Sequence, residues 1–308
     1  MGYRNKSVTV KVPATSANLG PGFDTLGIAL DIYLEVKLSL SENDKIIYHG
    51  EGQDTINQNI KNNYVYKAIQ LLFEKAGEKS GVHLEINNNI PVGKGMGSSA
   101  AAIVAGLFAA NELIDNSFTA EELVNLAVKL EGHADNVVPA VYGGLTTAMI
   151  YEDQVYYQKI SLPEELQIIV IVPDFNLPTE KSRSVLPEQL NLTDTVNNLQ
   201  RACFLLASIF NGDFTHINKA MDDMIYQPLR KQFIPGFDEV LTAAKSNGAL
   251  GAALSGAGPS IIAFAGGNAD GDSIGEAMKK ALLEQNVTSR IYNLHPNQHG
   301  IHLQTESM

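Results

Sequence analysis

The chain has 308 residues, enough for two domains at roughly 150 residues each. Its 44% hydrophobic and 18% charged residues are typical of globular proteins and exclude disordered, collagen-like and coiled-coil classes. The net charge of −12 repels phosphodiester backbones, so no nucleic-acid partner is expected.

The single cysteine and the absence of long apolar runs limit the chain further. Cys203 alone excludes an internal disulfide and a cysteine-based zinc site. The longest run of small and apolar residues, 100–110, is far shorter than the roughly 20 residues of a membrane span. The sequence therefore predicts a soluble, cytoplasmic protein with no membrane partner.

The first half of the chain combines strand-like and helix-like spacing. Three strands are predicted where every second residue is apolar, at residues 8–12, 32–40 and 82–86. A helix is predicted at residues 65–76, where apolar residues recur at helical intervals. Another begins at the capping box of Thr119 and Glu122 and ends at Gly132.

The second half alternates helices and buried strands. Buried strands are predicted at residues 168–172 and 260–265, and helices at about residues 193–210, 237–245 and 272–284. The best boundary between domains lies within residues 150–163, which divides the chain into 1–155 and 156–308. This order of elements favours an α+β fold in both halves.

One glycine-rich segment carries the strongest functional signal. Its residues are Pro91, Val92, Gly93, Lys94, Gly95, Met96, Gly97, Ser98, Ser99, Ala100 and Ala101. Glycines let backbone N–H groups approach an anion, and a helix start adds free N–H donors and a positive dipole end. A phosphate cradle is predicted, with the hydroxyl of Ser98 or Ser99 near a metal-bound phosphate. A plain strand-to-helix turn is the alternative.

Other glycine motifs do not fit this segment. No string matches the G-x-x-x-x-G-K-[ST] pattern, and position 98 is serine where a dinucleotide fingerprint needs its third glycine. The nucleophile elbow G-x-S-x-G fails because Ala101 stands in the final glycine position, which argues against a serine hydrolase.

Two further segments, residues 13–24 and 254–260, are rich in turn-forming and polar residues. In the first, the Asn18 amide could hold a substrate hydroxyl and the Asp24 carboxylate an ammonium group. The second leads into a buried strand, where small residues let a ligand or another backbone come close. Taken singly, each segment could equally be an ordinary loop.

Together the three segments resemble the three motifs of the GHMP small-molecule kinases, with Met96 where leucine is usual. The string P-A-T-S-A-N-L-G-P-G-F-D, residues 13–24, is similar to the opening of the members that phosphorylate homoserine. The resemblance continues through residues 131–136, 179–183 and 227–230, and covers about residues 12–264.

This resemblance implies an N-terminal ribosomal-S5-like α/β domain and a C-terminal ferredoxin-like domain. It also implies transfer of the ATP γ-phosphate to the L-homoserine hydroxyl, giving O-phospho-L-homoserine for threonine biosynthesis. ATP would lie against residues 91–101, and a homodimer would be usual. The alternatives are another GHMP kinase, for example of the mevalonate type, and a non-catalytic protein that binds phosphorylated metabolites.

The resemblance assigns homoserine-binding roles to Asn18, Asp24, Asn136, Thr179, Arg183 and Arg230. Asn18 would contact the attacking hydroxyl, and Asp24 and Asn136 would hold the ammonium group. The two arginines would clamp the carboxylate, because guanidinium forks match carboxylates bidentately.

Magnesium is expected to accompany ATP, with Ser98 and Glu131 as its protein ligands. Some GHMP kinases place an aspartate base near the attacking hydroxyl, where this chain has Asn136. Direct attack without a strong side-chain base is therefore predicted, with Asn18, Asp24 and Asn136 as the catalytic residues. Asp24 is the fallback base, and His133 a further alternative.

Overall fold

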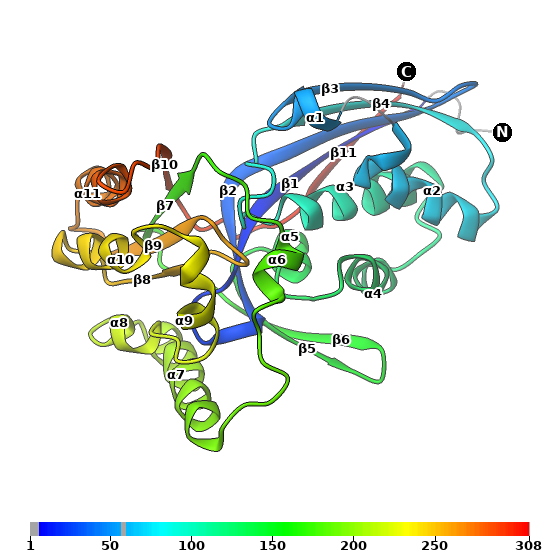
Figure 1. Ribbon diagram of the computed structural model, residues 1–308. Coiled ribbons are helices and arrows are strands. Elements are labelled where there is room, and N and C mark those ends of the chain that lie inside the picture. Colours follow the sequence, from blue (N-terminus) through cyan, green and yellow to red (C-terminus); the bar gives the residue numbers. More distant parts are fainter. Residues whose placement is uncertain (1–5, 57–59, 308) are drawn as a thin grey trace.

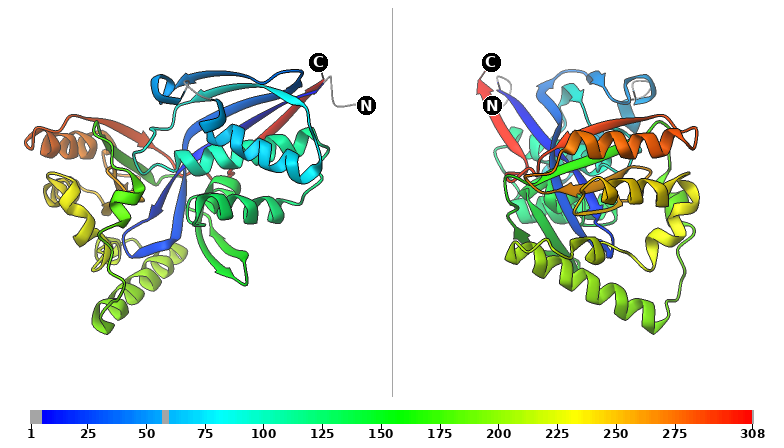
Figure 2. Two further views of the ribbon diagram at one scale, coloured as in Figure 1. Left: turned by 45° about the vertical axis from the view of Figure 1, so that its right-hand side comes forward. Right: turned by 90° about the vertical axis from the view of Figure 1, so that its left-hand side faces the viewer.

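The computed structural model describes residues 6–56 and 60–307, in which two sheets and their helices meet along one side (Figures 1 and 2). The first sheet has the strand order β11-β1-β2-β4-β3, with β5 paired to β2 and β6 paired to β5. Its strands are β1 (Lys6–Asn18), β2 (Gly22–Ser41), β3 (Lys45–Gly50), β4 (Gly81–Asn88), β5 (Leu145–Tyr151), β6 (Gln154–Ile160) and β11 (His302–Ser307). All pairs are antiparallel except β3 with β4.

The alternating segments of the sequence form strands of this sheet, as predicted. Val8, Val10 and Val12 lie in β1 with no exposed surface, and their polar neighbours face the other side. β1 and β2 continue well beyond the predicted ranges, because both pass into the buried interior between the two sheets.

Helices cover one face of the first sheet (Figure 1). They are α2 (Tyr64–Ala76), α3 (Ser98–Leu113), α4 (Ala120–Glu131) and α5 (Val137–Tyr142), with short turns α1 (Gln53–Ile56) and η2 (Ile60–Asn62) nearby. The capping box of Thr119 and Glu122 forms, and Gly132 ends α4 in the left-handed conformation. α3 is central and almost wholly buried. A Cβ at Gly106 would lie 2.4 Å from the Val65 carbonyl oxygen, so glycine lets α3 pack closely on α2.

The second sheet has the order β10-β7-β9-β8 and is antiparallel. Its strands are β7 (Gln167–Pro173), β8 (Gly251–Leu254), β9 (Ile261–Ala265) and β10 (Ser289–Leu294). α10 (Phe237–Ser246) and α11 (Gly271–Leu283) pack against it, which gives the βαββαβ order of a ferredoxin-like domain, as predicted. The connection from β7 to α10 carries α6 (Thr179–Arg183), α7 (Leu192–Asn211), α8 (Ile217–Ala220), α9 (Tyr226–Arg230) and η3 (Lys231–Phe233).

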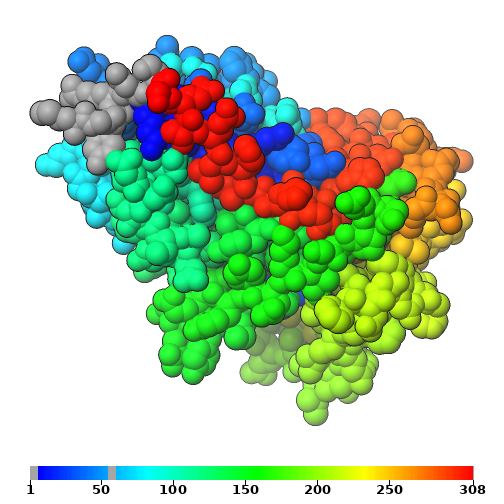
Figure 3. All heavy atoms as spheres, turned by 180° about the vertical axis from the view of Figure 1, so that it is seen from behind, coloured from blue at the N-terminus to red at the C-terminus, as the bar shows by residue number. Residues whose placement is uncertain are grey.

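The sheets do not follow the predicted division at residues 155 and 156. That division falls inside β6, which continues the first sheet, because Glu152 and Asp153 form the tight left-handed turn of the β5–β6 hairpin. The C-terminal strand β11 also returns to the first sheet and pairs with β1. Figure 3 shows it lying across the back of the molecule. The first sheet is therefore built from both ends of the chain.

Within the described residues, no helix combines the length and the apolar character that a membrane crossing requires.

Candidate active site

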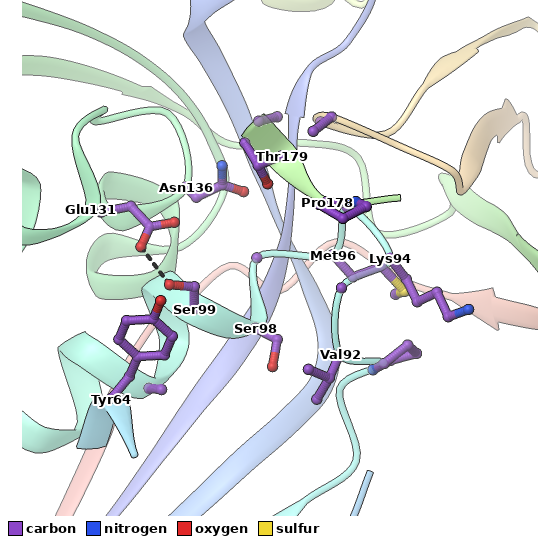
Figure 4. A pocket seen from close by; sticks show the side chains of 18 of the residues that line it. Tyr64, Val92, Lys94, Met96, Ser98, Ser99, Glu131, Asn136, Pro178 and Thr179 are labelled. Carbon is purple, nitrogen blue, oxygen red and sulfur yellow. Dashed lines mark hydrogen bonds between the residues drawn. The ribbon is translucent and has the colours of Figure 1, made fainter. Parts of the chain in front are cut away.

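A cavity of about 710 Å³ lies where the two sheets meet, and all three motif segments line it. Figure 4 shows its wall. All the residues predicted to bind the amino-acid substrate or the metal line this cavity: Asn18, Asp24, Ser98, Glu131, Asn136, Thr179, Arg183 and Arg230. The structure therefore collects residues from five separate parts of the chain into one place.

The glycine-rich loop forms the middle of this wall. Gly93, Gly95 and Gly97 have φ angles of 70°, 79° and 67°, a conformation that residues with a side chain rarely adopt. Two of them also allow close packing. A Cβ added at Gly95 would lie 2.2 Å from the Ser255 carbonyl oxygen, and a Cβ added at Gly97 would lie 1.9 Å from Thr15 Oγ1. Nothing lies within 4 Å of a Cβ at Gly93.

Helix α3 starts directly after this loop, at Ser98. Gly97 is its N-cap and supplies no side-chain acceptor, so the first N–H groups depend on another acceptor. The N–H groups and the helix dipole form a site for an anion.

The segment predicted to bind the nucleotide, residues 91–101, lines the cavity along most of its length. Residues 91–99 line the cavity, but Ala100 and Ala101 are fully buried in α3. Ala101 already donates its N–H to the Gly97 carbonyl at 2.9 Å. Both residues lie in the first turn of α3, on the side of the helix that faces the core.

Hydrogen bonds tie the three motif segments together. Thr15 N–H donates to the Met96 carbonyl at 3.2 Å, and Ser255 Oγ donates to the Gly95 carbonyl at 2.7 Å. Asn18 Nδ2 donates to the Gly256 carbonyl at 2.9 Å. These bonds fix the loop before any ligand arrives.

Lys94 points away from the predicted nucleotide position. Its Nζ donates to the backbone carbonyls of Pro173, at 2.9 Å, and Phe175, at 2.7 Å, at the end of β7. Burial lowers the pKa of this lysine, and the charge of Asp174 opposes that effect. Lys94 thus joins the loop to the end of β7 in the second sheet.

We expect Lys94→Met to lower stability by about 1–3 kcal/mol, because one buried and one part-buried carbonyl lose their donor. The KM for ATP should change less than about threefold if the ammonium group does not bind phosphate. Thermal unfolding and ATP titration of the variant measure both effects. A tenfold or larger rise in the KM for ATP, with stability unchanged, would instead place Lys94 at the nucleotide.

A chain of polar side chains lines the cavity from the start of α3 to the segment that follows α4. Ser99 Oγ donates to Glu131 at 2.7 Å, and His133 Nδ1 lies 2.7 Å from Asp135. Burial raises the pKa of Glu131, and the Ser99 hydrogen bond opposes the rise. Burial alone would lower the pKa of His133, but Asp135 and Glu131 outweigh it and raise that pKa.

Asn136 continues this chain. Its Oδ1 accepts from Thr15 Oγ1 at 2.8 Å, and its Nδ2 donates to Asp135 at 3.2 Å. Asn136 and Thr179 both line the cavity, and Figure 4 shows them at the side of the view away from Val92. Sequence reasoning missed Thr15 and Asp135. The sequence indicated them only indirectly, because they lie within residues 13–24 and 131–136, which carry the family resemblance.

The predicted metal ligands fit a magnesium ion only in part. Figure 4 shows Glu131 beside Ser99, with Ser98 directed elsewhere. The described residues hold no group of three or more His, Cys, Asp or Glu side chains able to enclose a metal. One buried carboxylate, serine hydroxyls and incoming phosphate oxygens still form the oxygen set that Mg²⁺ prefers.

Asp24 and Arg183 pair with each other across the cavity. The guanidinium donates to both carboxylate oxygens, at 3.1 and 2.5 Å. Burial alone would lower the pKa of Arg183, but the hydrogen bond and charge of Asp24 raise it. The two predicted ligands for opposite ends of an amino acid therefore satisfy one another.

Arg230 is the second guanidinium of the cavity and is only 2% exposed. Its Nε donates to the Ser182 carbonyl at 3.3 Å, and one terminal nitrogen donates to the Gly256 carbonyl at 3.2 Å. Burial lowers its pKa, and the charge of Arg183 adds to that effect. No described carboxylate lies within ion-pair distance of it, although the charges of Asp24, Asp223 and Asp135 oppose the fall in its pKa.

Phe23 was missed by the sequence reasoning and lies against both arginines. Its ring stacks on Tyr226 at 3.9 Å, with the guanidinium carbons of Arg183 and Arg230 at 5.2 and 5.1 Å from its centroid. An aromatic face attracts cations, so it offsets the repulsion between the two guanidinium groups.

We expect Phe23→Leu to raise the KM for the substrate that carries a carboxylate by about 3- to 30-fold, because the variant loses one or two cation–π contacts that hold the arginines in place. The KM for ATP and kcat should stay near their original values. Phe233→Leu is the matched control, since Phe233 contacts Lys181 instead. Steady-state kinetics of both variants provide the measurement, and equal effects would reject the role of Phe23.

The comparisons with known proteins agree with this geometry. Residues 63–144 match the GHMP kinases N terminal domain, and residues 205–284 match the GHMP kinases C terminal domain. The chain is 44% identical to a homoserine kinase of Halothermothrix orenii, over 92% of this chain and 91% of the relative. It is 43% identical to a homoserine kinase of Moorella thermoacetica, over 94% and 98%.

Solved structures show the same fold. A homoserine kinase of Cytophaga hutchinsonii superposes with a TM-score of 0.87 at 34% identity, and the match covers 97% of each chain. A mevalonate kinase of L. major reaches 0.74 at 21% identity, over 93% of this chain and 95% of the other, which shows the fold alone. With both domains matched in order and relatives this similar over almost their whole length, the chain belongs to the GHMP kinase family.

Proposed function

We propose that this protein is a homoserine kinase, which transfers the γ-phosphate of ATP to the hydroxyl of L-homoserine. The observation that carries the proposal is the pairing, in one cavity, of an anion-binding helix start with Asp24, Arg183 and Arg230. A carboxylate and two guanidinium groups suit a zwitterionic amino acid. A neutral sugar offers them no counter-charge.

The nucleotide would lie along the loop, with its phosphates at the N-terminus of α3. The cavity beyond the loop is bordered by apolar and aromatic groups that suit a purine ring, among them Leu34, Tyr64, Val65, Ile86 and Val92. The γ-phosphate would then point toward Asn136 and Thr179, where the amino-acid end begins.

Binding of homoserine would exchange partners at the ion pair. The substrate carboxylate would approach Arg183 and Arg230, and its ammonium group would approach Asp24, so both charges of the existing pair remain satisfied. This exchange favours a ligand that brings both charges, because a ligand with one charge leaves one partner unpaired.

We expect Asp24→Asn to raise the KM for homoserine by about 30-fold or more, as the loss of a charge partner costs about 2 kcal/mol. Turnover at saturating homoserine and its pH profile should remain close to those of the unaltered enzyme. Initial rates from pH 6 to 9 provide the measurement. A large fall in kcat with a shifted pH profile would mark Asp24 as the base.

The proposed reaction needs no strong side-chain base. Asn136, which stands where some GHMP kinases have an aspartate base, is hydrogen-bonded to Thr15 and Asp135, and an amide does not take up a proton at neutral pH. General-base assistance contributes about 10²–10⁴-fold, whereas alignment of two reactants can supply effective molarities of about 10⁵–10⁸ M. A loose phosphoryl transition state lets positioning and charge stabilisation dominate.

Magnesium belongs to this proposal, held by Glu131 and a serine hydroxyl together with phosphate oxygens. The ion would neutralise charge on the β- and γ-phosphates. Burial and the raised pKa of Glu131 favour a cation beside it. The proposed enzyme acts in the cytoplasm in threonine biosynthesis, with ATP and homoserine as its small-molecule partners.

ADP release with homoserine, serine, mevalonate and galactose, assayed in parallel with Mg·ATP, tests the proposal. Homoserine should give the highest kcat/KM by a wide margin. A preference for mevalonate or galactose would identify a GHMP kinase with another acceptor. ATP binding without ADP release on any of the four alcohols would indicate a non-catalytic binding protein.

A further inference from the structure

Asp223 is a buried carboxylate that lies between α8 and α9, outside the lining of the cavity, with 3% of its surface exposed. One of its oxygens accepts hydrogen bonds from the N–H groups of Ile225, at 2.8 Å, and Tyr226, at 3.1 Å. The other accepts from the N–H groups of Tyr226, at 3.1 Å, and Gln227, at 2.7 Å. The carboxylate therefore binds the backbone donors at the start of α9, which a helix leaves without partners of its own.

A second set of contacts joins this carboxylate to α7. Asn198 of α7 is 5% exposed, and its Nδ2 donates to Asp223 Oδ1 at 2.7 Å. Its Oδ1 accepts from the Met224 N–H at 2.9 Å. A buried amide and a buried carboxylate are costly unless they are hydrogen-bonded, and these two satisfy each other and the backbone between them. Together they hold the start of α9 against α7.

The side chains of α9 lie at the amino-acid end of the cavity. Tyr226 stacks on Phe23, and Gln227 Oε1 accepts from the Leu254 N–H of β8 at 2.5 Å. Arg230 stands at the last position of the same helix and lines the cavity. A helix of five residues is far too short to be stable by itself, so its anchors decide where these side chains lie.

The charge of Asp223 also acts on Arg230. Burial and the charge of Arg183 lower the pKa of Arg230, and the charges of Asp24, Asp223 and Asp135 oppose that fall. Among the described residues, no Lys or Arg side chain lies within ion-pair distance of Asp223, so no direct contact neutralises its charge. The hydrogen bonds of Asp223 go to α7 and to the start of α9 rather than to the guanidinium. Asp223 therefore favours the charged form of Arg230 without competing with a substrate carboxylate for its nitrogen atoms.

We propose that Asp223 is a positioning residue for the amino-acid substrate, which fixes α9 and thereby sets the place of Arg230 and of the ring of Tyr226 on Phe23. The inference rests on the proposed function, because it takes the ligand of Arg230 to be the homoserine carboxylate. None of the printed hydrogen bonds of Asp223 and Asn198 involves the glycine-rich loop, so binding of ATP does not depend on them.

Steady-state kinetics of Asp223→Asn test this role. The asparagine has the same shape, but its NH2 group faces N–H donors, so part of the anchor of α9 is lost. The KM for homoserine should rise about 10- to 100-fold, the effect of misplacing a binding group by about 1 Å, while the KM for ATP changes less than about threefold.

The matched control is Asp270→Asn, at the start of α11. The Asp270 carboxylate also accepts backbone hydrogen bonds at a helix start, from Asp272 at 3.1 Å and Ser273 at 3.4 Å. It contacts no residue of α9 through those bonds, so Asp270→Asn should leave both KM values unchanged. Equal effects of the two substitutions would reduce Asp223 to a general helix cap.

A double-substitution cycle separates positioning from a general loss of structure. If Asp223 acts through Arg230, Asp223→Asn added to Arg230→Met should raise the KM for homoserine by less than about threefold further, whereas independent effects multiply. Asn198→Ala removes the partner on α7 and leaves the carboxylate in place. It should raise the KM for homoserine about threefold or more with the KM for ATP unchanged, and it is the variant to measure where Asp223→Asn does not fold.

The outcomes distinguish this inference from the proposed function. If the unaltered enzyme phosphorylates homoserine, an unchanged KM for homoserine in the folded variants, an equal rise in both KM values, or full multiplication with Arg230→Met would overturn the role of Asp223 alone. An unaltered protein that does not phosphorylate homoserine would overturn the proposed function, and this inference with it.

Discussion

Replacement of Arg230 by methionine is expected to raise the KM for homoserine at least about 30-fold, while the KM for ATP changes little. The guanidinium is buried, and Arg183 provides a like charge beside it, so it is poised for an incoming carboxylate. Truncating one partner of a buried charge pair costs about 2–5 kcal/mol, which is about 30- to 5,000-fold in affinity.

The control for this experiment is Arg201→Met, which removes an arginine of α7 whose nearest carboxylate, on Asp222, is 3.8 Å away. It should leave both KM values unchanged. Steady-state kinetics and isothermal titration with each substrate provide the measurement. If ATP affinity falls as far as homoserine affinity, Arg230 serves the nucleotide or the loop conformation.

The second large effect is expected from Gly97→Ala, which should lower kcat/KM for ATP by about 100-fold or more. The new Cβ would lie 1.9 Å from Thr15 Oγ1, so either the loop or Thr15 must move. Thr15 also holds the Asn136 amide, so displacement reaches both substrates. A misplacement of about 1 Å at reacting groups can cost about 10²-fold in rate.

Backbone strain must be separated from the clash, because Gly97 has a φ of 67°. Gly77→Ala is the matched control, since Gly77 has a φ of 73°, ends α2 and has nothing within 4 Å of a new Cβ. It should lose about 1 kcal/mol of stability with full activity. Kinetics beside thermal unfolding distinguish the two variants, and similar activities would show that the close contact at Gly97 is unimportant.

Many of the helices and strands could be predicted from short-range patterns of residue type in the sequence. The alternation of β1, the capping box of α4 and the Gly132 stop each depend on neighbouring residues, so the sequence alone predicts them. The loop could also be singled out from the sequence, because alternating glycines before a helix start suit an anion site, and the resemblance to the family favoured that interpretation over a plain turn. Its three positive φ angles agree with that interpretation.

Tertiary packing decided the features that no local pattern contains. The return of β11 to β1 joins residues almost 300 positions apart, and the pairing of Asp24 with Arg183 spans 159. The same holds for Lys94, which lies in the loop predicted to bind phosphate while its Nζ binds the carbonyls of Pro173, at the end of β7, and Phe175, just beyond it. Charge and residue type determine what a side chain can bind. Its partner is determined by which group the folded chain brings within hydrogen-bonding distance, because such interactions extend only about 3 Å.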